Sequence, residues 1–111
     1  KMAKIIIDKL EAVRRQADVA IRLFASNDDP IAVHVLASSA FRILRDLAKK
    51  DENNFARGKF KESIIPEKEN DFWKAFNKFY NYFKHSDRDS NEVLYFEETM
   101  NDHLLFFVCT I

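Results

Sequence analysis

Hydrophobic residues recur along the chain in four segments, with the period that is typical of α-helices. The first segment is Ala3–Ala25, where one apolar face carries Ile6, Leu10, Val13, Ala17, Ala20 and Phe24. Three more apolar residues widen this face, namely Val19, Ile21 and Leu23. We therefore expect this helix to contact two neighbours. The polar break that follows offers Asp28 or Asp29 as a cap for the next helix, with Pro30 in its first turn.

The second segment, Pro30–Lys50, carries two neighbouring apolar stripes. One consists of Ala32, Leu36, Ala40 (or Ser39), Ile43 and Leu47, and the other of Val33, Ala37, Leu44 and Ala48. Many of these residues are small, and small residues allow helices to approach closely. The pattern predicts a central helix that forms an antiparallel hairpin with Ala3–Ala25. Ser38 and Ser39 are interpreted as packing residues in this helix.

Aromatic residues dominate the third segment, which begins at Asn70 or Asp71 and ends at Lys84. Its stripe is Phe72, Phe76, Phe79 and Phe83, flanked by Trp73 and Tyr80. The fourth segment begins near Glu97, with Met100, Leu104, Phe107, Val108 and Ile111 expected to point inward. Val93–Phe96 is either an extended run or the lead-in to that helix. A short additional helix is predicted at Phe60–Ile65.

Four amphipathic segments predict a single all-α domain over residues 1–111, an up-and-down four-helix bundle. The chain has one Gly, two Pro and one Cys. These counts exclude a β-sandwich, a glycine-rich phosphate loop and a cysteine-based zinc site, so we expect no cofactor and no metal. No apolar run approaches the length of a membrane span, which favours a cytoplasmic protein without a membrane partner. The apolar end at Leu104–Ile111 suggests that the natural chain continues.

Charge is unevenly distributed although 18 basic and 18 acidic residues cancel. Residues 42–61 hold seven basic and three acidic side chains, a local charge of +4, whereas residues 62–111 carry −5. Arg42 and Arg45 belong to the basic block. This block either faces phosphates or consists of solvated charges near a helix end, where Lys49 and Lys50 suit the helix dipole.

Candidate chemistry concentrates at the end of the third segment. Lys78, Asn81 and His85 follow one another at spacings of three and four, which places them along one edge of a helix. A histidine there can act as a general base near neutral pH. The alternative is a histidine that binds the last carbonyls of its own helix. Elsewhere, His34 is expected to be partly buried and hydrogen-bonded, His103 to be exposed and Cys109 to be buried.

The run Asn81-Tyr82-Phe83-Lys84-His85-Ser86-Asp87 resembles an Asn-x-Phe-Lys-His-x-Asp phrase of small bacterial proteins in the HEPN-type helical-bundle superfamily. Catalytic members of that superfamily are metal-independent ribonucleases that work as homodimers. They carry an Arg, four to six residues and then a His. Here the basic residue at an allowed spacing is Lys78, which lacks the forked geometry of Arg. Many members are non-catalytic.

This resemblance implies a role for each candidate residue. His85 would take the proton from a ribose 2′-hydroxyl, Asn81 would orient the phosphate, and two copies would form the cleft. Cations would offset the phosphate charge, namely Lys78, Lys84, Arg88, Arg42 and Arg45. The resulting hypothesis is a HEPN-like domain that binds or cleaves RNA. The alternative is a non-catalytic dimerising module that uses exposed aromatic side chains such as Trp73 and Tyr82.

Overall fold

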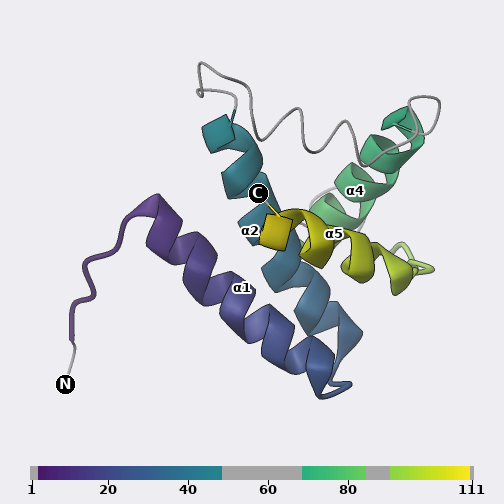
Figure 1. Ribbon diagram of the computed structural model, residues 1–111. Coiled ribbons are helices and arrows are strands. Elements are labelled where there is room, and N and C mark those ends of the chain that lie inside the picture. Colours follow the sequence, from purple (N-terminus) through teal and green to yellow (C-terminus); the bar gives the residue numbers. More distant parts are fainter. Residues whose placement is uncertain (1–2, 49–68, 85–90, 111) are drawn as a thin grey trace.

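The computed structural model describes residues 3–48, 69–84 and 91–110, and these ranges contain four α-helices (Figure 1). The helices are α1 (Lys9–Ala25), α2 (Pro30–Ala48), α4 (Glu69–Lys84) and α5 (Thr99–Thr110). No strand occurs in the described ranges, which confirms the all-α class. The helix predicted at Phe60–Ile65 lies outside the described residues. Residues 93–96, ambiguous from sequence, form neither helix nor strand.

Helix α1 begins six residues later than the hydrophobic period predicts. Asp8 has an extended backbone, and its carboxylate accepts a hydrogen bond of 2.8 Å from the Glu11 amide. An N-cap of this kind satisfies one of the free N–H groups in the first turn and fixes where the helix starts. The prediction of helix from Ala3 is therefore wrong. Ile6, which we expected on the inward face, is fully exposed.

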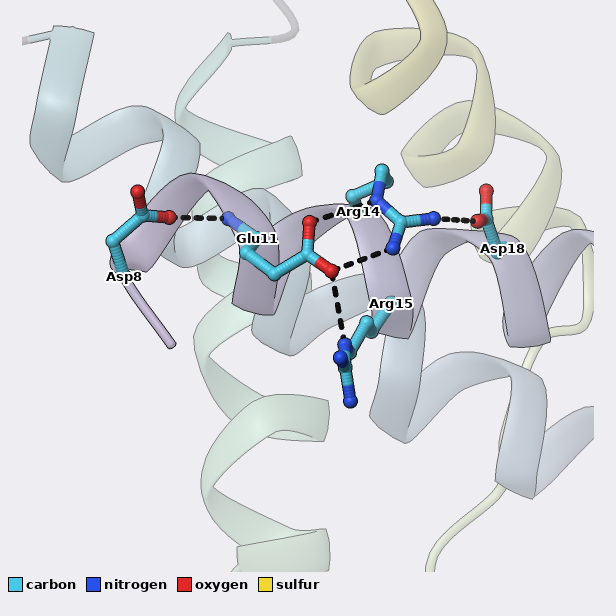
Figure 2. Close-up of polar contacts among 5 residues, drawn as sticks. All are labelled: Asp8, Glu11, Arg14, Arg15 and Asp18. Atoms are coloured by element: carbon cyan, nitrogen blue, oxygen red, sulfur yellow. Dashed lines mark hydrogen bonds and ion pairs between the residues drawn. The ribbon is translucent and has the colours of Figure 1, made fainter. Parts of the chain in front are cut away.

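Charged side chains on the polar side of α1 form a network of ion pairs within the helix, shown in Figure 2. Glu11 accepts hydrogen bonds from the guanidinium groups of Arg14 and Arg15, and Arg14 also donates to Asp18 at 2.9 Å. The hydrogen bonds from Arg14 and then Arg15 lower the pKa of the Glu11 carboxyl to about 2. Because all these side chains are solvated and belong to one helix, the network supports the helix locally.

Of the two residues predicted to cap α2, Asp29 is the one whose side chain does so. The Asp29 carboxylate accepts a hydrogen bond of 2.9 Å from the Ile31 amide, directly before Pro30 opens the helix. Asn27 has a φ of 54°, a left-handed conformation that Asn tolerates better than most residues. Helix α2 then runs back along α1, as predicted for the hairpin (Figure 1). It also contacts α4 and α5, which confirms it as the central helix.

The core is largely aromatic and surrounds Phe41 of α2, which is 1% exposed. The Phe41 ring lies 5.3 Å from Phe76 on α4 and 5.8 Å from Phe107 on α5, measured between centroids. The predicted stripe of α4 is confirmed, with Phe76 and Phe79 buried and its outer members half-buried. Rings of this size supply much of the apolar area that holds three helices together.

Several expected core residues are exposed. Leu10 and Phe24 are 63% and 44% exposed, because within the described structure α1 packs mainly against α2 through Val13, Ala17 and Ala20 and makes only a smaller contact with α5. Val19 and Ile21 are exposed as well. Cys109 is also exposed, since α5 turns Leu104, Leu105 and Phe107 inward and Cys109 outward. Trp73 and Tyr82, expected to be exposed, are half-buried.

Candidate nucleic-acid interface

The predicted site residues on α4 fall into two groups. Lys78, Asn81 and Lys84 are all exposed, whereas His85 and Arg88 lie outside the described residues. At about 100° of rotation per residue, Lys84 is turned about 120° away from Lys78 around the helix axis. The described part of the predicted catalytic edge is therefore Lys78 with Asn81, and Lys84 points in a different direction.

The two predicted arginines of α2 lie against aromatic rings of α4. The guanidinium carbon of Arg45 is 4.7 Å from the centroid of the Trp73 ring, and that of Arg42 is 5.4 Å from the Tyr80 centroid. Both distances are within the range of cation–π attraction. The rings themselves are fixed by the core, because Trp73 stacks on Phe41. Each arginine therefore contacts an aromatic ring of α4, a helix that is itself fixed by the core.

Lys84 joins this group from α4. Its ammonium lies 4.6 Å from the centroid of the Tyr80 ring and donates a hydrogen bond of 3.1 Å to the Tyr80 hydroxyl. Tyr80 therefore contacts one cation from each helix, Arg42 and Lys84. We call the five residues that make these contacts the basic–aromatic cluster: Arg42, Arg45, Trp73, Tyr80 and Lys84. It brings together three of the four residues predicted to contact nucleic acid.

The positive charge of the cluster is only weakly compensated. Among the described residues, the one carboxylate within ion-pair distance of it is Asp46, at 3.7 Å from Nε of Arg42 and 4.0 Å from Nε of Arg45. These separations exceed a hydrogen bond, and both Nε atoms are buried without a hydrogen-bond acceptor among the residues that the structure describes. Burial, together with the neighbouring Arg42, lowers the pKa of Arg45. Three cations beside one distant carboxylate favour an anionic ligand.

A buried polar pair links α2 to α5, and only its histidine was predicted from the sequence. His34 is fully buried, and its Nδ1 lies 3.1 Å from Oδ1 of Asn101. The amide nitrogen of Asn101 donates to the Pro30 carbonyl at 2.9 Å, so its oxygen faces the imidazole and Nδ1 of His34 carries the proton. The prediction of a hydrogen-bonded His34 is confirmed, and its burial is more complete than expected.

Three phenylalanine rings enclose the other side of the imidazole. The centroids of Phe79, Phe83 and Phe96 lie 5.8, 5.4 and 4.9 Å from that of His34, all in edge-on geometry. Nε2 of His34 is buried and has no hydrogen-bond partner in the described part of the chain. Burial lowers the pKa of His34, and the hydrogen bond with Asn101 opposes that shift. A neutral imidazole closed off from solvent in this way is a core residue rather than a proton carrier.

A pocket of about 450 Å³ lies between the turn that joins α1 to α2 and the beginning of α5. Its apolar lining includes Phe24, Pro30 and Val33, and its three carboxylates are Asp28, Glu98 and Asp102. None of these carboxylates forms an ion pair with a described residue. The sequence pattern does not indicate this pocket, because the two groups of residues that line it are separated by about 70 positions in the chain.

In residues 3–48, 69–84 and 91–110, no group of three or more His, Cys, Asp or Glu side chains is arranged to hold a metal ion. The same ranges contain no helix that is both long and apolar enough to span a membrane. Comparison with protein-family models, curated proteins and solved structures finds no match to this chain.

Proposed function

We propose that this chain is a non-catalytic RNA-binding domain whose basic–aromatic cluster contacts the phosphate backbone of a single strand. The observation that carries the proposal is the arrangement of Arg42, Arg45 and Lys84 around two rings of α4, with Asp46 as their one weak acidic partner in the described structure. Contacts of Lys and Arg with phosphates supply most of the affinity of proteins for nucleic acids.

The geometry of the cluster suits a phosphate backbone for two reasons. A guanidinium that already lies against a ring loses less conformational freedom when it binds an oxyanion. The rings also hold three cations close together, and a chain of phosphates is a ligand with repeated negative charge. Contacts with phosphates carry no information about the bases. The proposal is therefore binding to single-stranded RNA with little sequence preference.

The HEPN-type resemblance of residues 81–87 supports RNA over other polyanions and is part of the proposal. From the same resemblance we also propose that the helices form an up-and-down bundle and that the chain forms a homodimer. Catalysis is left out because Lys78 stands where the catalytic pattern needs an arginine. A single ammonium cannot make the forked contact with two phosphate oxygens that Arg makes.

Fluorescence anisotropy with a labelled single-stranded RNA of about 20 nucleotides tests the proposal. Arg42→Gln and Lys84→Gln should each weaken binding about fivefold, because each removes one phosphate contact. The matched controls are Arg22→Gln on α1 and Lys74→Gln on α4, which remove an exposed charge outside the cluster. The proposal fails if the wild-type protein does not bind, or if the controls weaken binding as much as the cluster variants.

A further inference from the structure

The three cations of the basic–aromatic cluster lie close together around Arg42. Tyr80 contacts two of them, because the Arg42 guanidinium carbon lies 5.4 Å and the Lys84 ammonium 4.6 Å from the centroid of its ring. Arg45 is three residues from Arg42 on α2, a spacing that places both on one face of the helix. Arg42 is therefore a neighbour of both other cations.

A carboxylate of the chain itself shows that one anionic group can lie near both arginines. Oxygens of Asp46 are 3.7 Å from Nε of Arg42 and 4.0 Å from Nε of Arg45, within ion-pair distance but too far for hydrogen bonds. In the part of the chain that the structure describes, neither guanidinium donates a hydrogen bond. The terminal N–H groups of both guanidiniums are therefore available to an oxyanion from another molecule.

The charge of this group matches a phosphate monoester better than a phosphate diester. Three positive side chains and the one carboxylate of Asp46 leave a net charge of +2. A phosphate inside an RNA strand is a diester with one negative charge and two free oxygens. A phosphate at the end of a strand is a monoester with a charge of about −1.5 to −2 near neutral pH and three free oxygens. Each cation of the cluster can therefore bind its own oxygen of a terminal phosphate.

We propose that the basic–aromatic cluster binds the phosphate monoester at the end of an RNA strand in preference to the phosphates inside the strand. This inference rests on the proposed function and specifies its ligand as a strand that carries a terminal phosphate. Arg42 contacts that phosphate together with Arg45 and Lys84. Internal phosphates bind the same cations more weakly, because a diester brings less negative charge to them.

Competition binding tests this preference. A fluorescently labelled single-stranded RNA bound to the wild-type protein is displaced by short unlabelled strands of one sequence, which carry a 5′-phosphate, a 3′-phosphate or hydroxyl groups at both ends. At least one phosphorylated strand should compete about fivefold better than the hydroxyl strand, and the better one identifies the end that is bound. Equal competition by all three strands would overturn this inference but leave the proposed function intact. No binding of any strand would overturn both.

Variants test whether the preference comes from the cluster. Arg42→Gln should bind phosphorylated and hydroxyl strands almost equally, and Arg42→Lys, which keeps the charge but loses the forked contact, should retain a preference of about twofold. The control Arg22→Gln removes an exposed charge on α1 and should keep the wild-type preference. The readout is the ratio of two affinities of the same protein, so a partial loss of folded protein does not change it. An unchanged ratio in Arg42→Gln, or an equal decrease in Arg22→Gln, would contradict the inference.

Discussion

The imidazole of His34 and the amide of Asn101 form a buried hydrogen bond of 3.1 Å across 67 positions of the chain. It fixes the beginning of α5 against α2, because Asn101 also holds the Pro30 carbonyl. Buried donors that lose their acceptor cost more than a hydrogen bond contributes when it is intact. This pair is therefore a specific determinant of how the last helix docks.

Asn101→Ala should lower the free energy of unfolding by about 2 kcal/mol, since it leaves the protonated Nδ1 of His34 buried without an acceptor. Urea denaturation followed by circular dichroism measures this change. The control is Asp102→Ala, the adjacent exposed residue, which should change stability by less than about 0.5 kcal/mol. Equal effects of the two substitutions would show that the buried pair does not hold α5.

Stability should fall as the pH decreases below about 6.5, because the pKa of His34 is lowered in the folded protein. Above that value both the folded and the unfolded chain hold a neutral imidazole, and the stabilisation is complete. Below it His34 binds a proton in the unfolded chain but stays neutral in the folded core. The free energy of unfolding therefore decreases with pH until the pH reaches the pKa of His34 in the folded protein. Denaturation at pH 7.5 and 5.5 checks this.

The charged neighbours of His34 determine the control for that experiment. The elements packed against His34 present Phe79 and Phe83 from α4, Phe96 from the segment before α5, and Asn101 from α5. The charged side chains that the structure describes in these elements are exposed, and none is among the causes of the shift of the His34 pKa. His34→Gln should therefore reduce the difference in stability between the two pH values, whereas exposed His103→Gln should leave it unchanged. The reverse result would assign the pH dependence elsewhere.

RNA incubated with the protein should remain intact, with or without EDTA. The reason is that Lys78 replaces the arginine expected at this distance before His85, and one ammonium stabilises a phosphate transition state less well than a guanidinium fork. Gel analysis of a labelled single strand measures cleavage, and His85→Ala is the comparison. Metal-independent cleavage that disappears in His85→Ala would show that the domain is a ribonuclease after all.

The hydrophobic period predicted the helices best where burial is deepest. Phe76 and Phe79 on α4 and Leu104 and Phe107 on α5 are all buried as expected. It failed at the start of α1, where isoleucines continue the period although Asp8 caps the helix after them. Periodicity shows which residues could share an apolar face of a helix, and it does not show whether another element covers each of them. The exposed Leu10 and Phe24 illustrate this limit.

The candidate site was predictable only in part. Arg42 and Arg45 were visible in the sequence within a local excess of basic residues, whereas Lys84 lies in the acidic half of the chain. Their contacts were not, because Arg42 and Arg45 on α2 meet Tyr80 and Trp73 on α4 only once the two helices pack. Spacing along one helix shows which of its residues share a face. Which residues of two different helices come into contact depends on how all the core side chains pack. The same reason hid Asn101 as the partner of His34.

The salt dependence of RNA binding tests the central claim most directly. For single strands, the logarithm of affinity falls with the logarithm of salt concentration by about 0.7 per phosphate contact. Replacing Arg42, Arg45 and Lys84 together by Gln should therefore reduce this slope by about 2, while Arg22→Gln leaves it unchanged. An unchanged slope in the triple variant would contradict the assignment of the basic–aromatic cluster as the phosphate-binding surface.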